Sequence, residues 1–198
     1  MKLILVRHGE TVENVAKIIQ GQTHGELTDL GIEQARKVGL RLKDEKIDIA
    51  YVSDLERTCA TAREILCFHP TVPIVYTKEL RERAWGIWEG QKSSGRKEFF
   101  SKEGHCINDY KPEGGESFDE MQKRMLAFIE TILKKQGKDT VLIVSHGGTI
   151  ASFYLSLFQK AKEEYKQYHP QNAAVTILEI SDNKKHTVHV LNCVKHLG

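Results

Sequence analysis

Two runs of apolar and β-branched residues constrain the fold of this chain most. Each run ends abruptly at a charged or polar pair. Leu3–Val6 is followed by Arg7 and His8, and 140–144 is followed two residues later by His146. Such runs, without polar alternation, are typical of strands whose two faces are both covered, as in a parallel sheet. Further strands are expected at 49–52, 74–76, 175–177 and 188–190, with a turn at 182–183.

Segments with helical spacing of apolar residues alternate with these strands. One begins after Thr28, a residue suited to cap a helix, and its apolar pattern extends to Ile47. Other helices are expected at 56–67, at 116–135 and from 147 to about 158. The alternation predicts a single α/β domain over residues 1–198, in which helices cover both faces of a mostly parallel sheet in three layers.

Residues 80–115 interrupt the alternation. This segment contains six glycines, both tryptophans and many charged residues. Insertions of this length in a compact domain often carry function. We therefore expect a partly helical insertion that contributes to a site.

Composition excludes several classes of function. The 198 residues include 29 basic and 27 acidic side chains, a net charge of +2 that favours neither nucleic acid nor membrane as a partner. No stretch approaches the roughly 18 apolar residues of a membrane span. The four cysteines are scattered, whereas zinc sites have closely spaced ligand pairs, so we expect reduced thiols in a cytoplasmic protein.

Three strand ends carry the residues that suit phosphoryl transfer. Ligands in such sheets bind beyond the carboxyl ends of the strands, where Arg7, His8, Arg57 and His146 would converge if the strands are neighbours. A neutral imidazole is a good nucleophile, and arginine forks match phosphate oxygens. The glycines beside each histidine, such as Gly147, would let backbone N–H groups approach the anion.

Two further expectations concern protons, and the second leaves two candidates open. His146 is expected to be protonated and to add positive charge near the phosphoryl oxygens. The leaving alcohol needs a proton, for which Glu82 is a candidate and Glu89 a competitor. The remaining histidines are expected to be surface or structural residues: His24, His69, His105, His169, His186, His189 and His196.

Several motifs carry a resemblance that runs in order over nearly the whole chain. The chain resembles the histidine phosphatase superfamily, which includes cofactor-dependent phosphoglycerate mutase. The matching segments are Arg7-His8-Gly9-Glu10-Thr11, Gln20-Gly21, 27–35, Ser53-Asp54-Leu55-Glu56-Arg57-Thr58, Leu80-Arg81-Glu82-Arg83 and Ser145-His146-Gly147-Gly148. The resemblance implies a phosphoglycerate mutase-like fold. The chain departs from many relatives at Ala84-Trp85, which affects the expected substrate wall.

The resemblance also implies roles for individual residues. His8 would be the nucleophile, and Glu82 would act first as acid and then as base for water. The phosphoryl group would be surrounded by Arg7, Asn14, Arg57 and His146, with Gln20 and Gly21 at the mouth of the site. No metal and no cofactor is implied.

The function expected on this basis is hydrolysis of a small phosphorylated metabolite through a phosphohistidine on His8. The short insertion favours a phosphatase over a phosphoglycerate mutase, which is the alternative enzyme. Segments such as Gln20-Gly21-Gln22 resemble the fructose-2,6-bisphosphatase branch typified by TIGAR, so a sugar bisphosphate is a candidate substrate. Arg83 and Lys92 are expected to hold a second phosphate or carboxylate, whereas Arg96 and Lys97 are expected to be solvated.

Other classes fit less well. The chain has neither the GxxxxGK[ST] spacing of a P-loop kinase nor a GxSxG elbow around Ser145. A non-catalytic module that binds phosphorylated ligands is the alternative from another class, although both the nucleophile and the acid are present. A monomer or a homodimer is expected.

Overall fold

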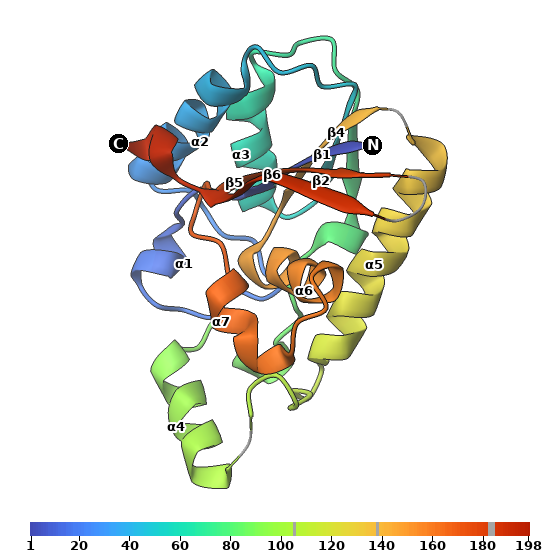
Figure 1. Ribbon diagram of the computed structural model, residues 1–198. Coiled ribbons are helices and arrows are strands. Elements are labelled where there is room, and N and C mark those ends of the chain that lie inside the picture. The colour runs from blue at the N-terminus through green and yellow to red at the C-terminus, as the bar shows by residue number, and fades with distance from the viewer. Residues whose placement is uncertain (105, 138, 182–184) are drawn as a thin grey trace.

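The computed structural model describes residues 1–104, 106–137, 139–181 and 185–198. These residues form one six-stranded sheet in the order β3-β2-β4-β1-β5-β6 (Figure 1). The strands are β1 Lys2–Arg7, β2 Ile49–Ser53, β3 Ile74–Thr77, β4 Thr140–Ser145, β5 Val175–Ile180 and β6 His186–Cys193. All six expected strands are confirmed, whereas the turn expected at 182–183 lies outside the described residues.

The sheet is mostly parallel, as predicted. β1 pairs in parallel with β4, and β2 pairs in parallel with both β4 and β3. β5 runs antiparallel to β1 and to β6. The strands that carry the histidine motifs are therefore direct neighbours, with β4 between β1 and β2.

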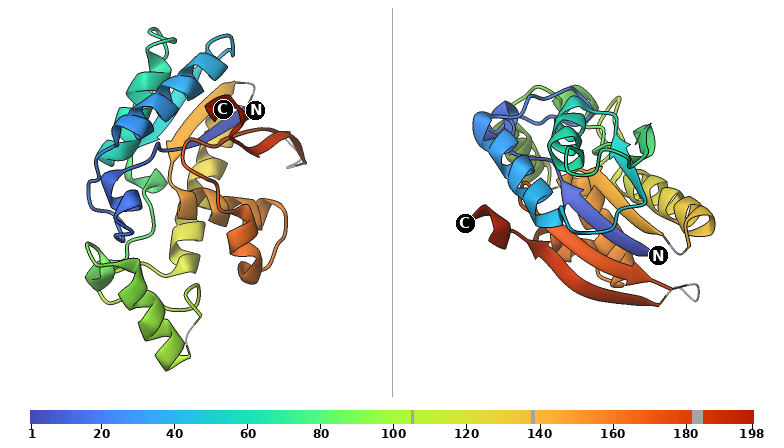
Figure 2. Two further views of the ribbon diagram at one scale, coloured as in Figure 1. Left: turned by 90° about the vertical axis from the view of Figure 1, so that its left-hand side faces the viewer. Right: turned by 90° about the horizontal axis from the view of Figure 1, so that it is seen from above.

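Helices cover both faces of this sheet (Figure 2). On one face, α2 (Asp29–Leu42) and α3 (Glu56–Leu66) pack with residues such as Val38 and Ile65 against the strands. On the other face lie α5 (Phe118–Lys135) and α6 (Gly147–Leu157), which contribute Met125 and Phe153 to a second apolar cluster. Burial of both faces explains why β1 and β4 are apolar throughout.

The helix cap predicted at Thr28 is observed. The Thr28 hydroxyl accepts a hydrogen bond from Gly31 N at 3.0 Å and caps α2. The helix ends at Leu42 rather than continuing to Ile47, because the chain turns there to enter β2. Asp48 fixes that entry by exchanging two hydrogen bonds with Thr140 of β4.

The insertion forms a small layer beyond the carboxyl ends of the strands, at the bottom of Figure 1. It follows the single turn η1 (Lys78–Leu80) and contains the single turn η2 (Gly86–Trp88) and the helix α4 (Ser93–Glu103). The segment between η2 and α4 is paired with the loop after the short helix α1 (Val12–Val15), since Ile19 N donates to Gln91 O at 2.9 Å and Ser93 N donates to Lys17 O at 2.8 Å. The insertion is thereby tied to the first strand end.

The remaining elements are short. η3 (Lys162–Glu164) and α7 (Tyr165–Tyr168) follow α6 and lead back to the sheet, and η4 (Lys195–Leu197) ends the chain. All four cysteines are free thiols, as predicted.

Candidate active site

His8 directly follows β1 and continues the hydrogen-bonded pairing of β1 with β4. Its backbone N donates to Ser145 O at 3.0 Å, which sets the ring 5.3 Å from the ring of His146, measured between centroids. The His8 side chain is almost fully buried, and its Nδ1 lies 2.8 Å from the carbonyl oxygen of Gly9. A carbonyl only accepts, so Nδ1 carries the proton and Nε2 keeps its lone pair.

The surroundings of His8 favour the neutral ring. Burial lowers its pKa well below the ordinary value, and the positive charges of Arg7 and Arg57 lower it further. The ring is therefore neutral at neutral pH, with the lone pair of Nε2 available. Its orientation is fixed by the Gly9 bond before any ligand binds.

His146 occupies the end of β4 as predicted, but its expected protonation is wrong for this structure. Arg57 Nε, which can only donate, lies 3.1 Å from His146 Nδ1. Nδ1 must then accept, so the proton sits on Nε2 and is directed to the Ser53 hydroxyl at 2.8 Å. Burial and the nearby Arg57 both lower the pKa of His146, in agreement with a neutral ring.

Arg57 is a buried organiser at the start of α3. Besides its bond to His146, it donates to the carbonyl oxygens of Thr23 at 2.7 Å and Gly21 at 2.8 Å. Burial lowers its pKa to about 10, which still leaves the guanidinium charged at neutral pH. Arg57 thus holds the 21–23 loop in place and supplies positive charge beside His8.

Arg7 has unused hydrogen-bonding capacity. Its Nη1 donates to Pro170 O at 2.8 Å, while its buried Nε has no partner among the described residues. Burial lowers the pKa of Arg7, and the negative charge of Glu82 partly opposes this effect. A buried donor without a partner is costly, and an anion bound in the cavity would satisfy it.

The structure distinguishes between the two candidate acids. Glu82 lines the cavity and is held there by two backbone amides, with Oε2 2.9 Å from Gly148 N and Oε1 2.8 Å from Arg83 N. Glu89 lies outside the cavity lining and accepts from Gln22 N and Trp85 N. Of these two carboxylates, Glu82 is the one that lines the cavity.

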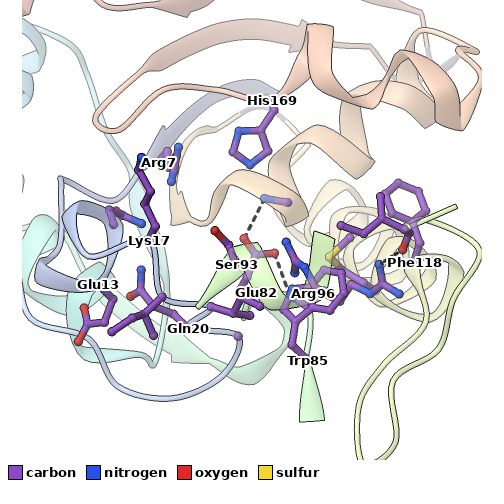
Figure 3. A pocket seen from close by; sticks show the side chains of 18 of the residues that line it. Arg7, Glu13, Lys17, Gln20, Glu82, Trp85, Ser93, Arg96, Phe118 and His169 are labelled. Carbon is purple, nitrogen blue, oxygen red and sulfur yellow. Dashed lines mark hydrogen bonds between the residues drawn. The ribbon is translucent and has the colours of Figure 1, made fainter. Parts of the chain in front are cut away.

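Arg7, His8, Arg57 and Glu82 line a cavity of about 380 Å³. Figure 3 shows Arg7, Glu82 and Arg96 arranged around it. The predicted site residues that line it are Arg7, His8, Asn14, Gln20, Gly21, Arg57, Glu82 and Arg83. His146 lies behind this wall and reaches the cavity through Arg57.

Asn14 and Gln20 are positioned by their neighbours. Asn14 Oδ1 accepts from Asn172 Nδ2 at 3.0 Å, which leaves the Asn14 amide as a donor. Gln20 Nε2 donates to the Thr11 hydroxyl at 2.9 Å. Both side chains therefore enter the cavity in a defined orientation.

Three residues predicted to bind substrate have other contacts. Lys92 is exposed, lies outside the lining and donates to Ala16 O at 2.7 Å. Arg83 lines the cavity, but its guanidinium donates to the carbonyl oxygens of Glu116, Ile107 and Tyr110. Gly147 lies outside the lining beside the His169 ring; it is the next residue, Gly148, whose amide meets Glu82.

Three residues were missed or misjudged from the sequence. His169 lines the cavity rather than the surface, and burial together with Arg7 lowers its pKa. Arg96 also lines the cavity, which corrects the expectation of a solvated side chain, whereas Lys97 is exposed as expected. Tyr165 lines the cavity together with Trp85, which the sequence analysis already related to the substrate wall. None of the three belongs to a strand-end motif that would have distinguished it.

Comparison with known proteins assigns the chain to a family. The model of the histidine phosphatase superfamily (branch 1) matches residues 3–193. The chain belongs to the histidine phosphatase superfamily. The solved structure of Bacillus stearothermophilus YhfR superposes with a TM-score of 0.91 at 29% identity, covering 100% of this chain and 99% of that one. The expected phosphoglycerate mutase-like fold is confirmed.

Several curated relatives have phosphatase names. A metal-independent phosphoserine phosphatase of Arabidopsis thaliana is 37% identical over 195 residues, which cover 92% of this chain and 78% of the relative. Fructose-2,6-bisphosphatase TIGAR of Bos taurus is 38% identical over 145 residues, covering 69% of this chain and 54% of the relative. These relatives are phosphatases named for small phosphorylated substrates, so the chain is assigned to the phosphatases of the superfamily.

The described residues contain no group of three or more histidine, cysteine, aspartate or glutamate side chains that could hold a metal ion. Within the same part of the chain, no helix is both long enough and apolar enough to cross a membrane.

Proposed function

We propose that the protein is a phosphomonoesterase that transfers the phosphoryl group of a small metabolite to His8 Nε2 and then to water. The observation that carries this proposal is the His8–Gly9 bond, which places the proton on Nδ1 and leaves Nε2 as the nucleophilic atom beside a cationic cavity. Arg7 and Arg57 flank the ring and supply positive charge for the phosphoryl oxygens.

The first step forms a bond between Nε2 and phosphorus and breaks the bond from phosphorus to the alcohol oxygen. The departing oxygen takes the proton of the Glu82 carboxylic acid, and the pair of electrons of the broken bond stays on that oxygen. The phosphorylated imidazole gains positive charge, and its Nδ1–H continues to donate to Gly9 O. That existing bond stabilises the intermediate without rearrangement.

The second step hydrolyses the intermediate. Glu82, now ionised, takes a proton from a water molecule whose oxygen attacks phosphorus, and the electrons of the N–P bond return to Nε2. Gly148 N and Arg83 N hold the carboxylate in both steps. Inorganic phosphate then leaves, with His8 and Glu82 restored.

The substrate is proposed to be a small phosphorylated metabolite, since the cavity of about 380 Å³ excludes a large folded ligand. The names of the relatives suggest phosphoserine and fructose 2,6-bisphosphate as members of that class. Phosphoglycerate mutase activity on the same phosphohistidine remains the alternative enzyme function. A purely binding role is less well supported, because the cavity keeps both the nucleophile and the acid.

The location and assembly complete the proposal. Four free cysteines fit the reducing cytoplasm, where we place the protein. Neither nucleic acid nor membrane is proposed as a partner. The protein is expected to be a monomer or a homodimer, which size-exclusion chromatography with light scattering would distinguish.

A turnover screen tests the proposed activity. Phosphate release is measured for phosphoserine, phosphoglycerates, fructose 2,6-bisphosphate, sugar monophosphates and p-nitrophenyl phosphate, with the His8→Ala variant and a matched His189→Ala control. His189 lies on the distant strand β6 and is exposed. We expect turnover that only His8→Ala abolishes. Binding of these ligands without release of phosphate by the unmodified protein would support the binding module instead.

A further inference from the structure

We propose that Arg96 binds a second anionic group of the substrate, a carboxylate or a second phosphate, at the wall of the cavity formed by the insertion. The proposal rests on the proposed function for the identity of the first anion, the phosphoryl group beside His8. It names the substrate class: phosphomonoesters that carry another negative charge on the alcohol portion.

The position of Arg96 is fixed from the backbone. It lies in the first turn of α4, one turn after Ser93, and both residues line the cavity. Ser93 N donates to Lys17 O and Gly90 N donates to Ile19 O, so the start of α4 is paired with the loop from the first strand end. A side chain on this turn is therefore held at a constant distance from the His8 side of the cavity.

The Arg96 guanidinium also lies over the Trp85 ring. Its carbon lies 4.0 Å from the centroid of the Trp85 ring, and the carbon of the Arg83 guanidinium lies 4.2 Å from the same centroid. Stacking of this kind uses the faces of the guanidinium and leaves its N–H edge for hydrogen bonds. An oriented fork of donors is suited to a carboxylate or phosphate.

The donors of Arg96 have no partner among the described residues, unlike those of Arg83 and Arg57, whereas Arg7 keeps its Nε free. The Arg96 Nε is buried without a partner, and no hydrogen bond or ion pair joins Arg96 to any described residue. Arg83, in contrast, donates to three carbonyl oxygens, and Arg57 donates to two carbonyls and an imidazole. Arg96 is thus a cation that the fold orients and partly desolvates but does not neutralise.

Electrostatics supports a role in binding. Burial lowers the pKa of Arg96 to about 10, so the group remains charged at neutral pH while having lost much of its hydration. A desolvated cation interacts more strongly with an anion than an exposed one does. Lys17 also lines the cavity, but it is exposed at the mouth, where water screens its charge.

The test measures binding in the His8→Ala background, where the ligands are not consumed. Two ligand pairs differ by one anionic group: 3-phosphoglycerate against sn-glycerol 3-phosphate, and fructose 2,6-bisphosphate against fructose 6-phosphate. Calorimetry gives the ratio of the two dissociation constants in each pair. Arg96→Gln removes the charge, Lys97→Gln is the matched control on the exposed side of α4, and Arg96→Lys restores the charge without the fork.

We expect the ligand with two anionic groups to bind more tightly in at least one pair, and Arg96→Gln to reduce that ratio by roughly 10- to 100-fold, as for loss of a hydrogen bond to a charged group. Lys97→Gln should leave the ratio unchanged, and Arg96→Lys should restore part of it. The pair that responds identifies carboxylate or phosphate as the second anion.

Any of three results would overturn the proposal. The ratio of dissociation constants could be the same in Arg96→Gln as in the His8→Ala parent protein, or it could fall equally in Lys97→Gln. The third such result is that neither ligand pair shows a preference for the doubly anionic ligand. Thermal melting of each variant separates a loss of fold from a loss of selectivity, and a folded Arg96→Lys protein provides the comparison if Arg96→Gln unfolds. This outcome is distinguishable from a failure of the proposed function. If the selectivity depends on Arg96 but the unmodified protein shows no turnover, the catalytic function is contradicted and the binding role of Arg96 is not.

Discussion

Replacement of Glu82 by glutamine separates proton transfer from positioning. The Glu82 carboxylate accepts two backbone N–H groups through different oxygens, Gly148 N on Oε2 at 2.9 Å and Arg83 N on Oε1 at 2.8 Å. A glutamine has one carbonyl oxygen, so its amide group must face one of these N–H donors. The substitution therefore removes a proton donor and also leaves one backbone amide without an acceptor.

The structural part of this effect is modest. An unsatisfied buried N–H costs about 1–3 kcal/mol, which for a chain of this size corresponds to a decrease in Tm of roughly 2–12 °C. The chemical part depends on the leaving group. General acid catalysis contributes about 10²–10⁴-fold when the alkoxide needs a proton, and far less when the leaving group departs unaided.

The assay compares kcat/KM for an alkyl phosphate and for p-nitrophenyl phosphate. Glu82→Gln should reduce the alkyl value by roughly 10²–10⁴-fold and the aryl value much less. Glu89→Gln is the matched control, because Glu89 accepts Gln22 N and Trp85 N through the same oxygen, Oε1, and a glutamine carbonyl can replace it. Equal losses on both substrates for Glu82→Gln, or a leaving-group-dependent loss for Glu89→Gln, would refute the assignment of the acid.

Three further predictions concern pH, packing and metal. The pKa values of His8 and His146 are lower in the folded than in the unfolded state, so the unfolded state binds more protons below about pH 6.5. The free energy of unfolding should therefore fall as the pH drops, by up to ~1.4 kcal/mol per pH unit for each histidine. Urea titrations at pH 5, 6 and 7 measure this change, and a constant free energy of unfolding would contradict the neutral rings. Arg83→Met should leave the carbonyls of Glu116, Ile107 and Tyr110 without their donor and destabilise the protein by about 3 kcal/mol or more, measured by denaturant unfolding; an unchanged midpoint would argue against that anchoring role. Prolonged treatment with EDTA should leave phosphatase activity unchanged, and a loss that a divalent cation restores would argue for a metal in the reaction.

The sheet and its catalytic edge were predictable because their determinants are local. Leu3–Val6 and 140–144 are apolar at nearly every position, which requires cover on both faces, and each leads directly to a histidine. Once β4 lies between β1 and β2, the positions of His8, His146 and Arg57 follow from the strand ends.

The substrate side of the cavity was not predictable in the same way. Arg96 and Lys97 are adjacent charged residues with no distinguishing local sequence, and only the pairing of α4 with Lys17 and Ile19 decides which one enters the cavity. His169 similarly reaches the cavity through tertiary packing. Its neighbour Pro170 is held near the end of β1 by a hydrogen bond from Arg7, although the two residues are far apart in the sequence.

The protonation state of His146 is determined by one hydrogen bond, which the sequence does not reveal. The sequence placed Arg57 and His146 in the same region, from which a cationic imidazole was expected to add charge. The structure shows Arg57 donating to His146 Nδ1, and this contact permits only the neutral ring. The positive charge in the site therefore comes from the arginines.

Identification of the residue that is phosphorylated during turnover shows whether His8 is the nucleophile. The protein is mixed with a labelled phosphate ester, quenched in base and digested, and the label is located by mass spectrometry. We predict one acid-labile, base-stable adduct on His8, absent from the His8→Ala variant and present in His189→Ala. Turnover by the unmodified protein with no adduct on His8, or with the adduct on another side chain, would contradict the account.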